Sequence, residues 1–414
     1  MSNERVLSTR CCIVGGGPAG MMLGLLLARA GVDVVVLEAH ADFLRDFRGD
    51  TVHPSTLELF AELGIKERFD ALPQQRVRHV KVLVDGELVP LVDFEGLEPF
   101  GYLSLVPQWE FLDFLASEAK RYPNFHLFMS TRGESLLFAG GRVNGVRAAR
   151  ETGPLRVEAD LIVGCDGRNS KLRAQAGLEV TNLGAPMDVL WFRLPREATD
   201  PSDTFGVPTR GRLMLLLQRE AYWQVGFVVS KAESTRIFEQ PIEALRTAIV
   251  RRVPWLEARV QALEWADVKR LEVRVDRLKR WHRPGLLFIG DAAHAMSPIG
   301  GVGINLAIQD AVAAANALAP AFEQPGVPDE SVLASIAKRR ALPTRATQAV
   351  QVLIQRTVIE PALAWDDDGT TAMPPLARRL LAARSVRTLP ARLFGLGVRR
   401  EHVTPRLRGE PRGT

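Results

Sequence analysis

A short apolar run near the start of the chain leads through glycines into a longer apolar run. Residues 11–15 read CCIVG, which predicts a buried strand, and GGGPAG then precedes MMLGLLLARAG, which predicts a helix. A second apolar run, VDVVVLE, predicts another strand that ends at Glu38. This order of strand, glycine-rich turn, helix and strand is typical of an α/β fold with a parallel sheet.

The glycines of this turn have the spacing of a dinucleotide-binding turn. In that pattern the first glycine, Gly15, makes the tight turn, the second, Gly17, admits a pyrophosphate, and the third, Gly20, lets helix and strand pack closely. Glu38 follows Gly15 by 23 residues, where an acidic side chain takes the ribose hydroxyls of adenosine. Glycine spacing alone is a weak signal, but its place between a strand and a helix predicts a cofactor with an ADP half. The candidate contacts are Gly15, Gly17, Pro18, Ala19, Gly20, Glu38 and Ala39.

A second glycine-rich turn lies within residues 286–318. The apolar strand LLFIG runs into GDAAHAMSPIGGVGIN, and an alanine-rich helix is expected from Leu306 onward with Asn305 as its cap. Asp291 stands where the strand ends, so its carboxylate can accept hydrogen bonds from a polyhydroxylated ligand. The glycines can bring backbone N–H groups close to a flat, electron-rich ring. The alternative is a glycine-rich turn that holds no ligand.

Four further candidates stand between the two turns. Arg48 lies in a polar loop and is either a surface arginine or a guanidinium that reaches a pyrophosphate or a substrate anion. His53 precedes a helix that begins PSTLELF and is more simply a loop or cap histidine than an acid or base. Gln108 opens an amphipathic helix and needs no other role, and Asp166 ends the buried strand ADLIVG.

Two regions show antiparallel strand patterns. Residues 76–93 alternate and turn at the DG pair of positions 85 and 86, which predicts a hairpin. Residues 186–230 contain MDVLWFRLP, GRLMLLLQR and AYWQVGFVVS, which predict strands of an antiparallel sheet. Three large aromatic residues of these strands are expected to pack in the core, with walls of a substrate pocket as the alternative. They are Trp191, Phe192 and Trp223.

Length and composition favour a two-domain protein of the cytoplasm. A chain of 414 residues, 46 % of them apolar, is too long for one compact core and can bury two. No run approaches the roughly 18 uncharged residues of a membrane span, and MSNERVLSTR carries no apolar signal segment. Cys11, Cys12 and Cys165 lack metal-site spacing and are expected to be buried thiols, so no metal site is predicted.

Positive charge is concentrated at the end of the chain. Residues 371–414 hold ten arginines and two glutamates, a balance of +8, whereas the whole chain carries +5. A pI raised by one terminal segment is weak evidence for base recognition, so nucleic acid is not an expected partner. We expect the segment to dock on the body of the protein, because its prolines divide it into short pieces. The alternative is a weak contact with an anionic membrane.

Three motifs in fixed order carry a family resemblance. With VGGGPAG, CDGRNS and GDAAHAMSPIGGVGIN, over roughly residues 8–345, the chain closely resembles the flavoprotein aromatic hydroxylases typified by p-hydroxybenzoate hydroxylase. The resemblance implies FAD as cofactor, NAD(P)H as co-substrate without a second dinucleotide domain, and a flavin C4a-hydroperoxide that hydroxylates an aromatic substrate. The lack of a WxWxIP segment argues against the flavin halogenases that share this frame.

The resemblance also implies roles for single residues. The first glycine turn and Glu38 would hold the ADP half of FAD, while Arg48 and Gln108 would approach its pyrophosphate and ribitol. Asp166 would lie near the pyrophosphate, and Asp291 would take a ribitol hydroxyl. The residues expected to face the isoalloxazine are Pro298, Gly300, Gly301, Gly303, Ile304 and Asn305. The catalytic candidates are Arg48, His53, Tyr222 and Pro298, of which Tyr222 does not securely match the tyrosine relay of the type enzyme.

The sequence thus predicts an α/β protein with a discontinuous Rossmann-like FAD-binding domain, an antiparallel-sheet substrate domain and a helical C-terminal segment. These are expected to comprise residues 1–75, 100–180 and 270–345, then 76–99 and 181–269, and finally 346–414. The expected activity is hydroxylation of an apolar aromatic or quinone-like small molecule with NAD(P)H and O₂. The alternatives are a flavin-dependent reductase or dehydrogenase without oxygen insertion and a non-catalytic FAD-binding protein. The sequence leaves the oligomeric state open.

Overall fold

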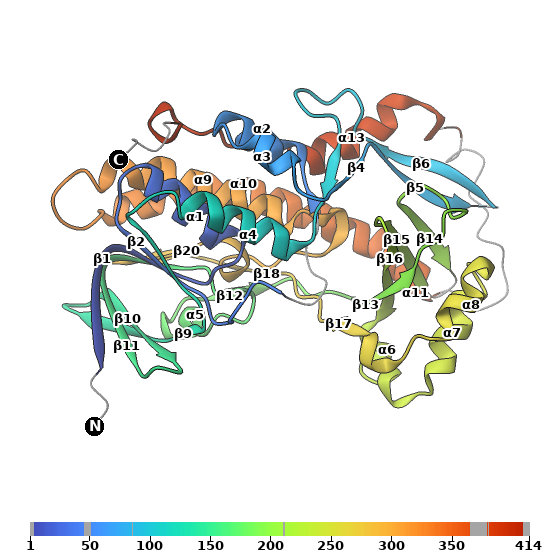
Figure 1. Cartoon of the computed structure of the whole chain (residues 1–414), viewed down its shortest axis with the longest axis horizontal. Helices are drawn as coiled ribbons and strands as arrows, with labels where there is room; N and C mark the ends of the chain where they lie inside the picture. Colours follow the sequence, from blue (N-terminus) through green and yellow to red (C-terminus); the bar gives the residue numbers. More distant parts are fainter. Residues whose placement is uncertain are drawn as a thin grey trace.

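The computed structural model describes residues 4–44, 51–84, 86–209, 212–364, 379 and 381–408. Two large sheets dominate it (Figure 1). The first, here called the parallel sheet, has the order β19-β20-β11-β1-β2-β8, and β10 and β9 extend it from β11. Its strands are β1 (Arg5–Val14), β2 (Val34–Leu37), β8 (Phe125–Phe128), β9 (Thr131–Ala139), β10 (Arg142–Arg150), β11 (Leu155–Gly164), β19 (His282–Arg283) and β20 (Leu286–Phe288).

The five central strands of this sheet run parallel. β1 pairs with β11 on one side and β2 on the other, β2 continues to β8, and β11 continues to β20. Parallel strands covered on both faces favour continuous apolar runs, as in VVVL of β2, where all four residues are buried. The carboxyl ends of these strands meet at one edge of the sheet, and both predicted glycine turns begin there.

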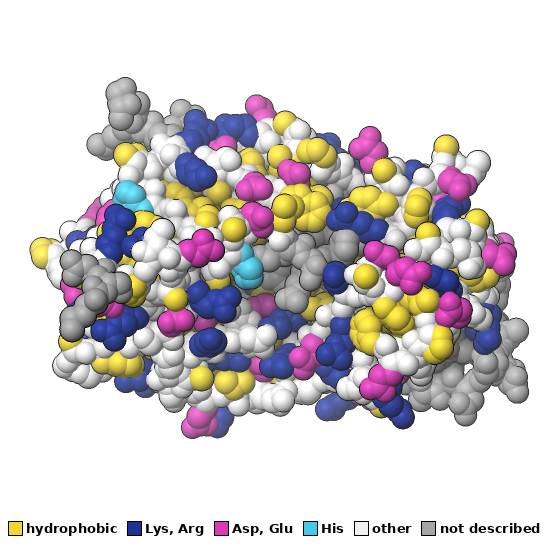
Figure 2. All heavy atoms as spheres, turned by 60° about the horizontal axis from the view of Figure 1, so that its bottom comes forward, with side chains coloured by type: hydrophobic (Ala, Val, Ile, Leu, Met, Phe, Trp, Pro, Cys, Tyr) yellow, Lys and Arg dark blue, Asp and Glu magenta, His cyan; other side chains and the backbone are white. Residues whose placement is uncertain are grey.

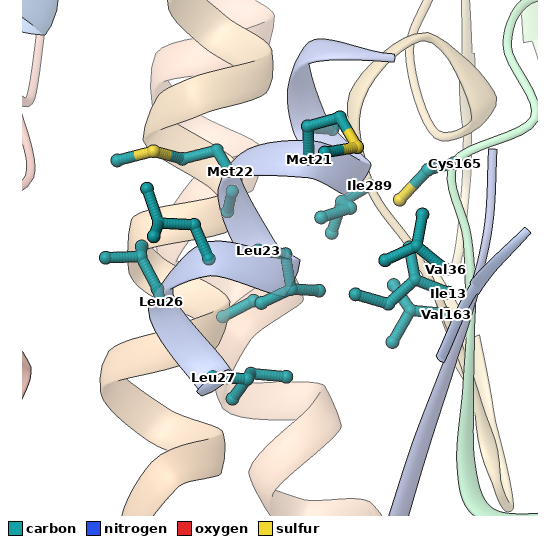
Figure 3. Close-up of a cluster of buried hydrophobic side chains, with 14 of the residues drawn as sticks. Ile13, Met21, Met22, Leu23, Leu26, Leu27, Val36, Val163, Cys165 and Ile289 are labelled. Carbon is teal, nitrogen blue, oxygen red and sulfur yellow. The ribbon is translucent and has the colours of Figure 1, made fainter. Parts of the chain in front are cut away.

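Helices cover one face of the parallel sheet (Figure 1). They are α1 (Pro18–Arg29), α4 (Gln108–Ala119) and α9 (Gly303–Ala321), with α10 (Glu330–Ile354) packed against α9. In Figure 3, Met22 and Leu26 of α1 point toward the neighbouring helices, while Ile13, Val36 and Val163 of the sheet lie on the other side. Helix α1 is therefore apolar all round because it is enclosed on both sides.

One long apolar helix is a core helix. Among the described residues, only the segment Ile299–Ala321 is long and apolar enough to cross a membrane by length and composition. However, 83 % of its 18-residue window is buried within the protein, and the core helix of a soluble protein passes the same test. Its apolar character is therefore explained by packing against α1 and α10.

The second large sheet, here called the antiparallel sheet, has the order β17-β13-β16-β15-β14-β5-β6. Its strands are β5 (His79–Val84), β6 (Glu87–Asp93), β13 (Met187–Pro195), β14 (Phe205–Thr209), β15 (Arg212–Gln218), β16 (Tyr222–Ser230) and β17 (Lys269–Leu271). All neighbours are antiparallel except β14 and β5, which are parallel. The predicted hairpin and the predicted later strands thus form one sheet. Asp85 of the hairpin turn lies outside the described residues.

Small elements link the two sheets. β3 (Thr51–Val52), β7 (Leu103–Leu105) and β4 (Gln75–Val77) form one short sheet, and β12 (Val180–Asn182) pairs with β18 (Asp276–Leu278). The other α-helices are α2 (Pro54–Glu62), α3 (Lys66–Asp70), α5 (Lys171–Gln175), α6 (Lys231–Ser234), α7 (Ile242–Val250), α8 (Glu257–Val260), α11 (Glu360–Ala364) and α13 (Arg384–Gly395). Single helical turns occur at Ile237–Glu239, Pro254–Leu256, Trp265–Asp267, Gly290–Ala292, Ile299–Gly301, Gln355–Ile359 and Pro405–Leu407.

The end of the chain folds back over the body. Residues 381–408, here called the C-terminal strap, begin with α13, which lies beside β6 (Figure 1). Ala391 of α13 is fully buried in a cluster with Phe94, and farther along Arg400 pairs with Glu58 of α2 at 2.8 Å. This part of the arginine-rich segment is therefore docked on the protein, while membrane contact stays a prediction.

Charges of both signs are mixed on the surface. On the face in Figure 2, Lys and Arg side chains alternate with Asp and Glu side chains over both halves of the molecule. Several arginines of the described residues are paired, for example Arg10 with Asp160 and Arg68 with Glu118, both at 2.6 Å. The positive net charge is thus dispersed on this face rather than gathered in a nucleic-acid-binding stripe.

Candidate cofactor and substrate site

The first glycine turn combines two packing glycines with one open position. Gly15 has a φ of +111°, and a Cβ there would lie 2.3 Å from the Cys165 carbonyl oxygen. A Cβ at Gly20 would lie 1.9 Å from the Gly15 oxygen. At Gly17, by contrast, an added Cβ meets no atom of the described residues within 4 Å, and this residue is the N-cap of α1. The turn therefore leaves space at a helix N-terminus, as a bound pyrophosphate requires.

Glu38 lies across this turn at the end of β2. Its buried carboxylate accepts hydrogen bonds from the Gly16 N–H at 2.9 Å and the His40 N–H at 3.0 Å, and the His40 imidazole Nδ1 lies 2.8 Å away. The partly buried Ala39 lies between them. Hydrogen bonds from the turn and the following loop thus hold the carboxylate beside the glycines, where the sequence predicts it.

The second turn packs against the first. Gly290 has a φ of +61°, and a Cβ there would lie 3.0 Å from the Cβ of Ala19 and 3.5 Å from the Cβ of Ala307. Helix α1, which starts at Pro18, and helix α9 therefore approach the Gly290 backbone from two sides. Two motifs far apart in the sequence meet in this way at the carboxyl edge of the parallel sheet.

Asp291 has a partner that the sequence analysis missed. Its Oδ2 lies 2.9 Å from Nη2 of Arg168, and both side chains are partly exposed. Arg168 follows the DG pair of CDGRNS, so the pair itself was the available signal. Oδ2 of Asp166 accepts from the Leu172 N–H at 3.4 Å, whereas its buried Oδ1 has no hydrogen-bond partner among the described residues. Burial raises the pKa of the Asp166 carboxyl, and hydrogen bonds from Ser170 and the Leu172 amide oppose this effect.

Neighbouring side chains enclose the loop of residues 298–303. Gly300 and Gly301 have φ values of +78° and +63°. A Cβ at Gly301 would lie 2.9 Å from the Thr51 hydroxyl oxygen, and a Cβ at Gly300 would lie 2.8 Å from the Phe394 ring. Pro298, a partly buried residue, precedes the loop. The tight fit leaves no room for side chains at either glycine, so the backbone itself lines this position.

His53 is hydrogen-bonded to the same loop. Its Nε2 lies 3.1 Å from the Gly301 carbonyl oxygen, and the side chain is fully buried. Burial lowers the pKa of the His53 imidazole to about 4, and backbone groups of Gly301, Gly300 and Phe394 offset this only in part. The imidazole is therefore neutral near pH 7 and its Nε2–H donates to the loop. This geometry suits a positioning role better than the acid or base role considered from the sequence.

The predicted cap of α9 is wrong. The helix begins at Gly303, with Val302 as its N-cap, so Asn305 lies inside the first turn. The buried Asn305 Oδ1 accepts from the Ser55 hydroxyl at 2.9 Å and from the Thr56 hydroxyl at 2.7 Å. The amide therefore binds α2 instead of capping its own helix. Ile304 is buried in the main core, whereas a Cβ at Gly303 would meet no atom within 4 Å in the part of the chain that the structure describes.

Comparison with known proteins identifies the family of the chain. A model of the family described as FAD binding domain matches residues 8–351. The chain belongs to this family. It is 32 % identical over 356 residues to the 6-methylpretetramide 4-monooxygenase of Streptomyces rimosus, covering 85 % of this chain and 84 % of the relative. It is 26 % identical to the para-nitrophenol 4-monooxygenase of Pseudomonas sp. strain WBC-3, covering 74 % and 76 %.

A solved structure shows the same fold. The P. aeruginosa PqsL in complex with 2-aminobenzoylacetate superposes with a TM-score of 0.74 at 22 % identity, covering 86 % of this chain and 98 % of that chain. The predicted α/β architecture with a Rossmann-like FAD-binding fold is confirmed. The protein is an FAD-dependent monooxygenase that acts on aromatic substrates, as the sequence motifs predicted.

In this monooxygenase the two faces of the antiparallel sheet differ. Phe192 and Trp223 are fully buried on the face covered by α7 and α8, so their predicted core role is confirmed. Trp191 lies on the opposite face, and its ring would contact a Cβ at Gly226 at 2.9 Å. There it packs against an apolar cluster that is also contacted by Ile299, a residue of the glycine loop of residues 298–303. Trp191 therefore packs on the apolar cluster of the second face and not in the α7 core, and its role as a pocket wall stays a prediction.

Tyr222 of the monooxygenase lies close to α4. The Arg193 guanidinium lies 4.6 Å from the centroid of the Tyr222 ring and 5.7 Å from that of Trp109. Trp109 follows Gln108, the first residue of α4. Tyr222, from the antiparallel sheet, and the start of helix α4, which carries Gln108, thus lie on either side of Arg193. Arg48 lies outside the described residues.

Proposed function

We propose that this monooxygenase uses NAD(P)H and O₂ to hydroxylate an apolar aromatic or quinone-like small molecule. One oxygen atom enters a carbon–hydrogen bond of the substrate, the other leaves as water, and NAD(P)H with one proton supplies the two electrons. The observation that carries this proposal is an apolar cluster between the antiparallel sheet and the glycine loop. In it, Trp191, Leu213 and Val228 of the sheet pack with Ile299 of the loop. An apolar cover of this kind excludes water from a reactive oxygen species.

The residues present fit FAD. The open position at Gly17, at the N-terminus of α1, suits the pyrophosphate, and Glu38 suits the adenosine ribose. Asp291 is partly exposed at the carboxyl edge of the sheet and can accept a ribitol hydroxyl. Asp166, in contrast, is engaged with the start of α5, so we propose an indirect role for it in holding the segment that carries Arg168.

When bound, FAD takes a hydride from NAD(P)H and activates O₂ for transfer of one oxygen atom. The chain supplies the surroundings of that chemistry. Backbone N–H groups of residues 300–305 would stabilise negative charge that develops at one edge of the ring system. His53 would fix the loop by its hydrogen bond to Gly301, and Pro298 would shape the oxygen side.

The substrate class follows from the second face of the antiparallel sheet. Trp191 and Gly226 form an apolar part, and Gln224 with Arg219 forms a polar part, with a hydrogen bond of 2.9 Å between them. A relative is named for 6-methylpretetramide and another for para-nitrophenol. We therefore propose a substrate whose aromatic ring system carries a polar substituent, with Tyr222 near the polar end.

The proposal includes the division of the chain and its location. Residues 76–99 and 181–269 are taken as the substrate domain, supported by β5 and β6 joining β13 to β17 in one sheet. We propose a cytoplasmic enzyme, supported by three buried free cysteines, Cys11, Cys12 and Cys165.

The test measures NAD(P)H oxidation, O₂ uptake and product mass together, using aromatic compounds of these kinds. Hydroxylation predicts a product one oxygen atom heavier, with label from ¹⁸O₂ and none from labelled water. NAD(P)H oxidation whose product lacks the label would favour a reductase or dehydrogenase. Bound FAD without any NAD(P)H oxidation would favour a non-catalytic protein. The Gly17→Val variant serves as the FAD-free control.

A further inference from the structure

The C-terminal strap lies beyond the region that defines the family. The family match ends at residue 351, whereas the strap comprises residues 381–408. The first part of the strap is bound to the end of the β5–β6 hairpin. Arg384 Nε lies 3.2 Å from the buried Asp93 carboxylate, and Arg384 Nη2 donates to the Glu95 carbonyl oxygen at 2.9 Å. Gly395 fits against the same hairpin region, since a Cβ there would lie 3.2 Å from the Phe94 ring.

The strap contacts the glycine loop directly. The Phe394 ring lies over Gly300, where a Cβ would meet three of its carbon atoms between 2.8 and 3.1 Å. The ring also packs on a small apolar cluster of Met296, Val302 and Leu306. Met296 precedes the loop, Val302 belongs to it, and Leu306 follows it. Phe394 therefore forms the outer support of the segment whose inner support is His53.

The strap also reaches the Gly290 turn through buried charges. Glu401, 1 % exposed, lies 3.3 Å from Nη1 of the buried Arg340. Arg340 Nε donates to Oδ1 of Asp310 at 2.8 Å, and Asp310 Oδ2 accepts from the Gly290 N–H at 3.1 Å. His294 is bonded to the same carboxylate. A chain of hydrogen bonds thus runs from the strap to the backbone next to Asp291.

These charges depend on each other. Burial alone raises the pKa of the Asp310 carboxyl, but the charges and hydrogen bonds of His294 and Arg340 outweigh it and hold that pKa below its ordinary value. Arg339 shares Glu401, with Nε 2.7 Å from Oε2. Asp310 and Glu401 are thus the two carboxylates that contact Arg340, and removal of the Glu401 charge leaves this buried guanidinium with one anion fewer.

We propose that Phe394 and Glu401 are positioning residues for FAD: Phe394 supports the glycine loop and Glu401 supports the Gly290 turn, both from outside the family-defining region. The inference rests on the proposed function in one respect, that FAD contacts both the Gly290 turn, through Asp291, and the glycine loop. Phe394 and Glu401 hold these two segments so that their N–H and carboxylate groups keep the geometry that FAD needs. Loss of either support should therefore weaken FAD binding and should increase the NAD(P)H that is oxidised without forming product.

The first test is Phe394→Ala, with Leu389→Ala as matched control because Leu389 lies on the same helix and is 69 % exposed. Titration of apoprotein with FAD should show affinity weakened by about tenfold in Phe394→Ala and unchanged in the control. The visible absorption band of bound flavin should shift, and more NAD(P)H should be consumed per product, with hydrogen peroxide as the balance. Phe394→Leu, which keeps an apolar side chain, should restore part of the affinity.

The second test is Glu401→Gln, compared with Arg406→Gln, which removes a surface ion pair with Glu323. Weakened FAD affinity in Glu401→Gln alone, in protein that melts cooperatively, supports the proposal. Unchanged FAD affinity and absorption in both Phe394→Ala and Glu401→Gln would overturn it. Because the titrations need no turnover, they decide the strap's role even if the protein fails to hydroxylate any compound.

Discussion

At the scale of single residues, the three glycines of the first turn have different physical tasks. Gly15 and Gly20 are required by the protein's own packing, because a Cβ at either would lie within 2.3 Å of a carbonyl oxygen. Gly17 has ordinary backbone angles, φ −74° and ψ −175°, and open space around its missing Cβ. Packing of the described residues does not require glycine at this position, which agrees with the proposal that a ligand approaches the backbone there.

We therefore predict opposite outcomes for two substitutions. Gly17→Val should yield folded, colourless protein, because valine tolerates the extended backbone but blocks the approach of the pyrophosphate. Gly20→Val should reduce soluble, folded protein, because its side chain collides with the Gly15 backbone. Absorbance of bound flavin and thermal melting distinguish the two. Full FAD occupancy in Gly17→Val would refute the assignment of this turn.

His53 predicts a dependence of stability on pH. Its folded-state pKa of about 4 lies below the ordinary 6.5, so the unfolded chain binds the proton more readily between these values. The contribution to stability is complete above pH 6.5 and is lost as the pH falls. Between pH 7 and pH 5 this histidine should cost the folded state about 2 kcal/mol.

Urea unfolding at both pH values checks this prediction. His53→Gln should show a smaller fall in the free energy of unfolding than the parent protein. His126→Gln is the control, because His126 is an exposed histidine beside Asp33 and should leave the fall unchanged. Equal pH dependence in the parent and His53→Gln would contradict the buried, neutral state of this imidazole.

At the scale of elements, the turns at strand ends decide the site. The turn after β20 carries Asp291, and the segment after β11 carries Arg168, which bind each other at 2.9 Å. Neighbouring parallel strands bring these two segments together at the same edge, although over 100 residues separate them. The carboxylate is thus oriented by a guanidinium while one face stays accessible.

Asp291→Ala should weaken FAD binding by about tenfold to a hundredfold, because a charged hydrogen-bond acceptor at a ligand hydroxyl is lost. Arg168→Gln should weaken it less, since it leaves the carboxylate in place and removes only its orientation. Titration of apoprotein with FAD measures both. An affinity equal to that of the parent protein in Asp291→Ala would exclude the ribitol role.

At the scale of the whole molecule, the strap runs from the end of β6 to helix α1 and supports both the glycine loop and the Gly290 turn. Glu401 and Ala391 are buried, so moving the strap onto a membrane would expose both residues. It would also remove Glu401 from the buried Arg340 guanidinium. We therefore expect the intact protein to stay in solution when mixed with vesicles of equal parts phosphatidylglycerol and phosphatidylcholine. Removal of residues 381–414 should lower the melting temperature and release flavin.

Co-sedimentation and flavin absorbance report the outcome. Binding to these vesicles that weakens with added salt, and disappears in the truncated protein while its FAD is retained, would favour the membrane alternative. Loss of flavin or of cooperative melting on truncation would favour docking, as the structure of the described residues indicates.

The sequence by itself determined the features that depend on neighbouring residues. The glycine spacing, the acid at the end of β2 and the order of strands and helices follow from backbone conformation and from apolar runs, which are local properties. They were enough to predict the cofactor and the fold class, while the candidate contact residues stay predictions. The helix start at Gly303 was missed because Asn305 fits a cap locally, but two hydroxyls of α2 bind it instead.

Only the tertiary structure decided which distant groups meet. No local pattern indicates that β5 would pair with β14, that Arg168 would bind Asp291, or that Phe394 would cover Gly300. Trp191 and Phe192 are adjacent aromatic residues on opposite faces of one strand. What packs on each face, α7 and α8 on one and Ile299 of the glycine loop on the other, depends on the tertiary structure. Such contacts depend on how whole layers pack, because burial and charge pairing are settled between elements and not along the chain.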